Sequence, residues 1–229
     1  MSFTFDPYKL RAGDVTEAQD VLMTNPTALN EMERYWASLP RTRGVPLRKD
    51  VDPAQMGGLL EDSFILERVA PGVARIRVAG RNIAKLIGIE PRGLPLTAAF
   101  LPEARAEVGQ YLEKAFTSPG LVELALSSPR AVGQPKLHGK ILMLPLRDDH
   151  GRVSRIMGVL VMSGRRGMGG RRFALSKEIP ARFEPTVGLQ VVPNIPTATT
   201  RPSLRSVATG PDSKKAGDMP ALRLVVSNS

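Results

Sequence analysis

Few residues of this chain have the type and spacing that catalysis or metal binding requires. Asp50 and Asp52 are a close pair of carboxylates, a combination that elsewhere binds a cation or works as an acid and a base. Here they stand in an extended connector, with Arg48 and Lys49 beside them and Pro53 directly after Asp52. An aspartate before a proline favours a cap for the following turn, so we expect Asp52 to fix the connector.

Other reactive side chains are scarce or isolated. The chain has no cysteine, which excludes disulfides, thiolate metal ligands, cysteine nucleophiles and a covalent flavin adduct. Its two histidines are His138, at the start of a predicted strand, and His150, in a predicted turn, and neither position favours a haem ligand. No histidine is placed so that the sequence predicts a nucleophilic site at Ser63, Ser127 or Ser154. We therefore expect a non-enzymatic protein with no catalytic residue, no metal site and no resident cofactor.

Three arginines form a cluster that could recognise a ligand or a partner. Arg75 and Arg77 are two residues apart in a predicted strand, and Arg81 opens the helix after it. Guanidinium groups in this arrangement bind anionic ligands or acidic protein surfaces. The alternative, which the pattern favours, is a solvated sheet face on which Glu67 or Glu123 from neighbouring strands pairs with them.

The elements that would carry these residues are short strands and helices. Residues 73–79 alternate with the period of two that a strand requires. Residues 153–162 are almost continuously apolar, which is typical of a central strand covered on both faces. Pro145 indicates an edge position or a bulge in the strand that contains it. The predicted elements are helices at 27–39, 81–87 and from Pro102 to the break at Pro119-Gly120, and strands at 63–69, 73–79, 121–127, 137–147 and 153–162.

The first predicted helix has one apolar face. Its stripe of large side chains ends at Pro40, which cannot continue a helix. Such a stripe either packs on its own domain or pairs with a second copy of itself, and the sequence favours neither. The side chains expected to form this interface are Met32, Tyr35, Trp36 and Leu39.

Composition divides the 229 residues into one domain with two flanks. The predicted organisation is a loose leader at 1–26, a domain at 27–162 and a flexible basic tail at 163–229. The tail holds most of the net charge of +10, with 11 Lys or Arg against 4 Asp or Glu, and one apolar island at Leu222–Val226. The chain has neither 18 uninterrupted apolar residues nor a signal-type leader. We therefore expect a cytoplasmic protein with no membrane span.

Two separated blocks of residues form a recognisable pattern. They consist of Tyr35-Trp36, Gly44, Pro46, Arg48 and Asp50–Pro53 in the first, and of Arg77–Ile83 with Leu86–Gly88 in the second. This pattern resembles the PAS-domain family, in its bacterial branch of stand-alone proteins without a fused output domain. The resemblance covers roughly residues 29–162 and departs from the family after Gly88, where Ile89-Glu90-Pro91 replaces an acidic residue and a leucine. It implies an α+β fold, a single five-stranded antiparallel sheet with helices on one face that enclose a small cavity.

The resemblance also implies a sensory or adaptor role. A small unidentified ligand in the cavity would shift the docking of helix 27–39. Because the chain has no room for an output domain, the change would reach a signalling partner in trans through protein–protein contacts, and we expect a homodimer. The side chains predicted to line the cavity are Phe64, Leu66, Ile76, Val78, Leu86, Phe116, Met143 and Val159.

The basic tail supports an alternative function. It would bind nucleic acid or another anionic surface, with the PAS-like domain as a dimerisation platform. A charge-rich tail is more often a solvating segment than a specific reader, so specific nucleic-acid recognition is not expected. Whether the Leu222–Val226 island docks on the domain as an added strand stays open.

Overall fold

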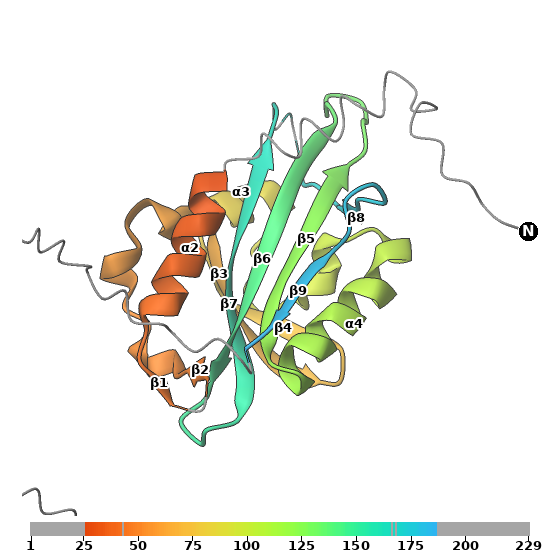
Figure 1. Cartoon of the computed structure of the whole chain (residues 1–229). Coiled ribbons are helices and arrows are strands. Elements are labelled where there is room, and N and C mark those ends of the chain that lie inside the picture. Colours follow the sequence, from red (N-terminus) through yellow and green to blue (C-terminus); the bar gives the residue numbers. More distant parts are fainter. Residues whose placement is uncertain (1–25, 43, 166, 168, 187–229) are drawn as a thin grey trace, which may run out of the picture. The chain divides into compact units, whose positions relative to one another are not determined.

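Seven strands form one antiparallel sheet in the part of the chain that the computed structural model describes, residues 26–186 without positions 43, 166 and 168 (Figure 1). The strands follow the order β4-β3-β7-β6-β5-β8, and β9 also pairs with β5. Their bounds are Ser63–Ala70 (β3), Val73–Ala79 (β4), Gly120–Ser128 (β5), Leu137–Arg147 (β6), Val153–Ser163 (β7), Ala174–Leu175 (β8) and Arg182–Pro185 (β9). A separate two-stranded ribbon joins β1 (Arg41–Thr42) to β2 (Val45–Pro46).

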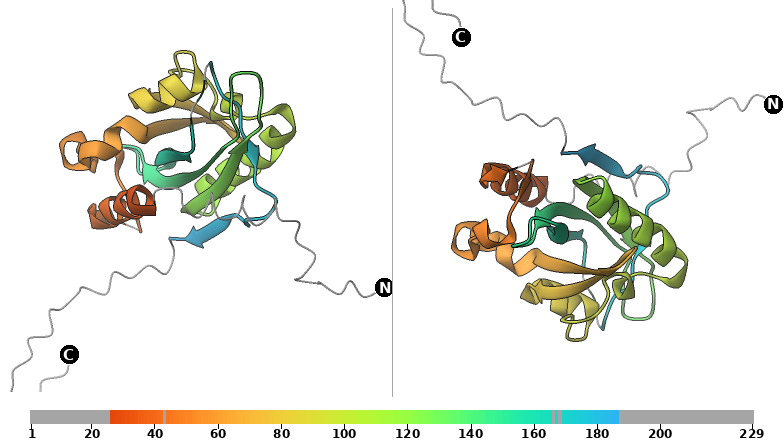
Figure 2. Two further views of the ribbon diagram at one scale, coloured as in Figure 1. Left: turned by 90° about the horizontal axis from the view of Figure 1, so that it is seen from above. Right: turned by 90° about the horizontal axis from the view of Figure 1, so that it is seen from below.

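Helices cover both faces of this sheet (Figure 2). The face that we call inner is covered by α3 (Arg81–Ile87), the 3-10 turn η3 (Leu96–Ala99) and α4 (Pro102–Thr117). The outer face is covered by α2 (Pro26–Ser38) and the 3-10 segment η2 (Pro53–Asp62), which follows the short turn η1 (Arg48–Asp50). The fold is therefore α+β, as the sequence predicts.

The central strands contribute to a hydrophobic core on each side. In β7, Ile156 and Leu160 belong to the inner core, whereas Met157 and Val159 belong to the outer core. This division follows from the alternation of side chains along a strand. It confirms the prediction that residues 153–162 form a central strand covered on both faces.

The ends of two helices follow from local sequence. Pro102 starts α4 in its first turn, with Glu103 beside it, and Lys114 lies in the last turn. Both charges suit the helix dipole, and proline loses no hydrogen bond at that position. Gly88 ends α3 in the left-handed conformation, at φ 80°, which a glycine adopts without strain.

The five strands predicted from sequence are present with almost unchanged bounds. Pro145 lies in β6 and pairs with Ile156 of β7, but the pairing of β6 with β5 ends at Met143 and Val122. The missing N–H of the proline therefore falls beyond the last pair between β6 and β5, where the next bridge is that of Leu47 with Arg147. Because β6 lies between β7 and β5 in the sheet, the expected edge position holds only for this end of the strand.

The domain boundary expected at residue 163 is wrong for the part of the tail that the structure describes. Here β8 and β9 lengthen the five-stranded sheet by pairing with β5. Phe173 is 0% exposed, and its ring lies 6.3 Å from that of Phe100 at an angle of 69°. Two-residue and four-residue strands are too short to show a periodic pattern, so sequence periodicity missed them. Residues 1–25 and 187–229, which include the Leu222–Val226 island, lie outside the described residues.

A close contact between two glycines lets the chain return past α3. A Cβ added to Gly88 would stand 2.6 Å from the Cα of Gly170. The amide of the next residue, Arg171, donates to Leu86 O at 2.7 Å. Composition predicts that Gly170 belongs to a flexible basic tail, but here the glycine allows close packing against α3.

Candidate functional site

Helix α2 is held on the outer face of the sheet mainly by apolar contacts. Met32 and Trp36 are 0% and 1% exposed, and Leu29 and Leu39 are also buried. They share a core with side chains of β5, β6 and β7, namely Leu121, Leu142, Leu144, Leu146, Met157, Val159 and Val161. Of the two interpretations that the sequence leaves open, the structure therefore shows the apolar stripe packed on its own domain.

Trp36 adds a directional contact to this packing. Its indole Nε1 donates a hydrogen bond of 2.9 Å to Pro145 O, beyond the point where β6 stops pairing with β5. The guanidinium of Arg41 lies over the ring, 4.4 Å from its centroid, and burial lowers the pKa of Arg41 below its usual value. The indole is thus fixed both at its edge and on its face.

Tyr35 ties α2 to the connector that follows it. Its hydroxyl donates to Asp52 O at 3.1 Å and accepts from Asp52 N at 2.7 Å, and burial raises the pKa of Tyr35 despite the backbone hydrogen bond. The carboxylate of Asp52 accepts from Ala54 N at 2.9 Å and from Gln55 Nε2 at 3.1 Å. This confirms that Asp52 is a cap that fixes the connector.

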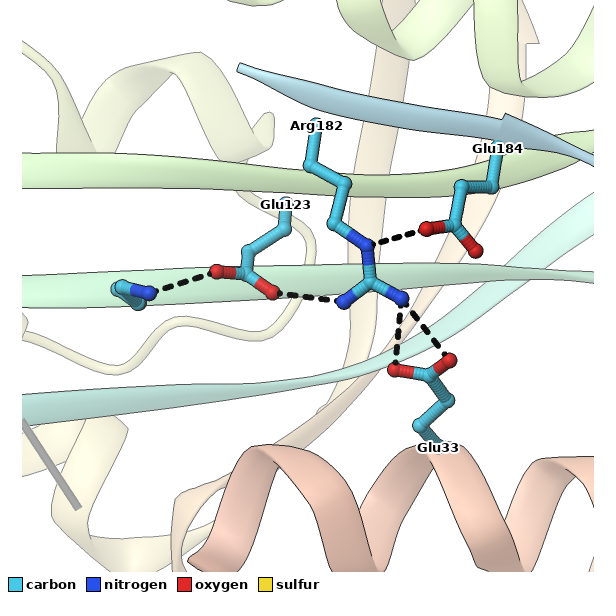
Figure 3. A network of polar contacts seen from close by, with 5 residues as sticks. Glu33, Glu123, Arg182 and Glu184 are labelled. Carbon is cyan, nitrogen blue, oxygen red and sulfur yellow. Dashed lines mark hydrogen bonds and ion pairs between the residues drawn. The ribbon is translucent and has the colours of Figure 1, made fainter. Parts of the chain in front are cut away.

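Arg182 is the centre of an ion network that joins α2 to the edge of the sheet (Figure 3). Its Nη2 donates to both carboxylate oxygens of Glu33 in α2, at 3.0 and 3.2 Å. Its Nη1 lies 3.3 Å from Glu123 of β5, and its Nε lies 2.6 Å from Glu184 of β9. Lys140 of β6 contacts the other oxygen of Glu123 at 2.8 Å. The guanidinium group of Arg182 therefore forms ion pairs with three carboxylates, one from each of α2, β5 and β9.

The charges of this network stabilise one another. The hydrogen bond to Glu184 raises the pKa of Arg182 above its usual value, with Glu33 adding to the effect, and the same bond lowers the pKa of Glu184. The side chains of Arg182 and Glu33 are 39% and 32% exposed. Because solvent and salt reach them, the Glu33–Arg182 contact is worth under about 1 kcal/mol. It orients α2, while the apolar stripe supplies most of the binding.

Neither Glu33 nor Arg182 is recognisable as a site residue from sequence alone. They are 149 positions apart, and Arg182 falls in the segment that composition predicts to be tail. A weak indication does exist, because the dipeptides Arg172-Phe173 and Arg182-Phe183 place aromatic residues in an otherwise polar stretch. Large aromatic side chains in such a stretch indicate burial.

The eight residues predicted to line a cavity do not lie on one face. Six of them belong to the inner core, namely Phe64, Leu66, Ile76, Leu86, Phe116 and Met143. Val159 instead belongs to the outer core under α2, and Val78 is 53% exposed. The prediction is wrong for these two valines.

A β-bulge explains the position of Val78. In the pairing of β3 with β4, Leu66 lies opposite Ile76, but Ile65 lies opposite Val78, so Arg77 is an extra residue. An extra residue reverses the face of the side chains that follow it. Ile65 belongs to the outer side of the sheet, and Val78 follows it there. Simple alternation could not predict this shift.

The three arginines of the predicted anion site contact groups of their own chain. Arg77 pairs with Glu67 and Arg81 with Glu61, while Arg75 donates to Gly93 O at 2.7 Å. Burial opposes ionisation of Glu67, but hydrogen bonds from Arg77 and from a second arginine lower its pKa. This arrangement matches the solvated sheet face that the sequence favours.

The histidines occupy different surroundings. His150 lies in the exposed turn between β6 and β7, whereas His138 is buried in β6. The strand register places Ser127 opposite His138, a proximity that their separation in the sequence conceals. Within the described residues, no group of three or more His, Cys, Asp or Glu side chains could hold a metal ion. In the same part of the chain, no helix has the length and apolar character needed to cross a membrane.

Comparison with known proteins agrees with this architecture. A family model described as PAS domain matches residues 23–161. Two similar solved structures are a light-state LOV domain of the blue-light photoreceptor Aureochrome1 and a light-oxygen-voltage domain studied with a flavin analogue. The first has a TM-score of 0.37 and 20% identity over 50% of this chain and 89% of that one. The second has a TM-score of 0.36 and 21% identity over 50% and 87%.

No curated protein matches the chain significantly. The family model nevertheless spans more than half of the 229 residues. The chain therefore belongs to the PAS domain family, a family of sensory domains, which confirms the resemblance seen in its sequence. The assignment depends on the family model and not on the two solved structures, because their TM-scores are below 0.5.

Proposed function

We propose that this chain is a sensory or adaptor protein that acts without catalysis, by changing how α2 docks and so which protein it contacts in trans. The observation that carries the proposal is the construction of the outer face. A strongly apolar sheet surface is covered mainly by α2, a helix of 13 residues, with η2 beside it. Besides the contacts of Trp36 and Tyr35, the exposed Glu33–Arg182 pair orients this helix. Displacement of α2 would expose a surface suited to an apolar helix of a partner.

The size of α2 makes such a displacement accessible. An isolated helix of about 13 residues is marginal in water, so α2 depends on the sheet for its stability. Burial of Leu29, Met32, Trp36 and Leu39 contributes roughly 2–3 kcal/mol for each side chain, and the exposed ion pair adds under about 1 kcal/mol. The inner face is held by more elements, and the segments of lower local stability open at free energies below that of global unfolding. A partner or ligand with a modest preference for one state would therefore shift the population.

The chain is well suited to a direct test. Trp36 is its only tryptophan, so the emission maximum of the protein reports the docking of α2. In the Glu33→Gln variant, the contact with Arg182 is weakened, whereas Glu31→Gln changes an exposed acid of the same helix and serves as a charge-matched control. Partners should be captured from an extract of the native host with each variant and with the wild type.

The expected result is a partner that Glu33→Gln captures about threefold more than the wild type or Glu31→Gln does. The purified partner should then shift the Trp36 emission to longer wavelength. Equal capture by all three proteins, with Trp36 emission unchanged by the partner, would contradict the proposal. Native mass spectrometry of the same preparations would show whether the chain forms the expected homodimer and whether it retains a small molecule.

The alternative function, binding of nucleic acid through the basic tail at 163–229, depends in part on the residues after 186, which the structure does not describe. It predicts binding that disappears between low and moderate salt and on deletion of the residues after 186. The cytoplasmic location and the homodimer likewise stay predictions from the sequence.

A further inference from the structure

A groove of about 640 Å³ opens beside the inner core, between α4 and the segment that joins β8 to β9. We call residues 174–185 the strap. The floor and walls of the groove include apolar side chains from α4, from β5 and from the strap, among them Tyr111, Leu124, Leu175 and Ile179. A groove of this volume is within the usual range for small-molecule sites, about 300–1,000 Å³.

The groove exists because the strap leaves β5 and returns to it. Leu175 pairs with Leu126, and the next amide, Ser176 N, donates to Ala125 O at 2.8 Å. Pairing resumes only at Arg182, which lies opposite Glu123. Residues 177–181 are thus left opposite Leu124 and bow away from the sheet. Interruptions of strand pairing of this kind commonly mark functional sites.

The charges around the groove favour a cation. Glu103 and Glu107 lie one helical turn apart on α4 and line one wall, and Lys177 of the strap lines the other. Two carboxylates face one ammonium group across an apolar floor. A molecule with an apolar body and one cationic group matches this lining in both charge and hydrophobicity, whereas a fatty acid or a phosphate would meet the two carboxylates.

The strap also connects the groove to α2. Ala181 lines the groove, and the next residue, Arg182, holds Glu33 of α2. Phe183 points to the opposite side, where Lys114 of α4 lies 4.0 Å from its ring centroid. Neighbouring residues of a strand face opposite sides of a sheet, so β9 contacts α4 with one face and α2 with the other. A change in the bowed part of the strap therefore acts directly on the arginine that orients α2.

We propose that this groove binds an amphipathic small molecule with a cationic group, and that its occupancy changes α2 through Arg182. The first half of this proposal is independent of the function proposed above, whereas the second half rests on it. The ligand site is then a lateral groove beside the inner core and not the core itself, where six of the residues predicted to line a cavity pack together.

The test uses three probes that differ in one feature each. Decyltrimethylammonium has the apolar chain and the cation, decanoate has a similar chain with an anion, and tetramethylammonium has the cation alone. Each is titrated below its micelle concentration into the isotopically labelled full-length chain, and affinity and location are read from amide chemical shifts. Decyltrimethylammonium should bind about tenfold more tightly than the other two, with shifts in α4 and the strap.

Two double variants test whether the carboxylates that line the groove cause its preference for a cation. Glu103→Gln/Glu107→Gln should weaken decyltrimethylammonium about fivefold and leave decanoate unchanged or tighter. Glu31→Gln/Glu90→Gln removes the same charge from exposed acids outside the lining and outside the strap, and should leave all affinities unchanged. Equal binding of decanoate, equal effects of both double variants, or shifts confined to other surfaces would overturn the assignment of the groove.

The connection to α2 has its own readout. At saturating decyltrimethylammonium, hydrogen exchange of the α2 amides should change at least twofold, and Arg182→Gln should remove this change without altering the affinity. If the probe binds in the groove and α2 does not respond, the connection is wrong and the groove assignment stands. If no probe binds but a captured partner still shifts Trp36 emission, the assignment of the groove as a ligand site is wrong and the proposed function stands.

Discussion

The two faces of the sheet are both apolar but are covered in different ways. The inner face lies under three helical elements and Phe173, and its core members come from most of the chain between Phe64 and Phe173. The outer face lies mainly under α2 and η2, and its edge is joined to α2 by exposed ions around Arg182. Similar apolar side chains are thus buried on both sides of the sheet. The inner side forms a core that many elements share, whereas the helix over the outer side is also held by exposed polar contacts.

The function proposed for α2 rests on this difference. Removing a helix from the inner face would expose side chains that many elements share, whereas removing α2 exposes one strip and breaks a few polar contacts. Conformational change in proteins uses the elements of lowest local stability. The strap touches both regions, because Phe183 belongs to the inner side and Arg182 to the outer.

The largest expected effect is on the inner face. Phe173→Ala should lower the free energy of unfolding by about 3–5 kcal/mol, since it removes a fully buried ring and its contact with Phe100. Chemical denaturation followed by circular dichroism measures the change, and Val132→Ala, at a fully exposed turn position, is the control. A loss no larger than that of Val132→Ala would show that Phe173 is not part of the inner core.

A smaller effect is expected on the outer face. Trp36→Phe should cost about 2 kcal/mol, because it leaves Pro145 O without its indole donor and reduces packing on the sheet. Hydrogen exchange should rise in α2 far more than in α4. If both helices respond alike, the two faces unfold as one unit and the contrast between them is wrong.

Asp148, in the turn between β6 and β7, is expected to make the stability of the protein depend on pH. Burial opposes ionisation of Asp148, but hydrogen bonds from Arg152 N, Ser154 and His150 N lower its pKa from 3.8 to about 2. Since the folded pKa is the lower one, this contribution is fully present above pH 4 and is lost as the pH falls towards 2. Asp148→Asn should cost about 1 kcal/mol at pH 7 and flatten the dependence of stability on pH between 4 and 2.

Denaturation curves at pH 2, 3, 4 and 7 provide the measurement for Asp148→Asn. An acid limb that stays as steep in this variant as in the wild type would show that the acid-sensitive contact does not lie in the turn.

The smallest expected effect concerns the ion network itself. Arg182→Gln should lower the free energy of unfolding by roughly 0.5–1 kcal/mol at low salt and by less at 1 M NaCl, where exposed charges are screened. The emission of Trp36 should shift towards the value of a more exposed indole. Arg75→Gln, which removes an exposed arginine bonded to Gly93 O, is the matched control and should leave Trp36 emission unchanged.

The contrast between the faces was only partly predictable. Alternation in residues 73–79 and the continuous apolar run at 153–162 correctly indicated strands, and Gly88 and Pro102 marked helix ends. Alternation failed at Val78, where one extra residue reverses the face. It failed at Val159 for another reason, because a strand buried on both sides gives no sign of which face is inner.

Local patterns in the sequence determined the strands, the helices and the family of this protein, because periodicity, caps and turns depend on neighbouring residues. Only the tertiary structure decided where α2 lies, that Arg182 meets Glu33 from 149 positions away, and that the strap bows to form a groove. These features depend on contacts between distant segments. No local pattern encodes them, since each segment alone is too short or too polar to reveal its partner.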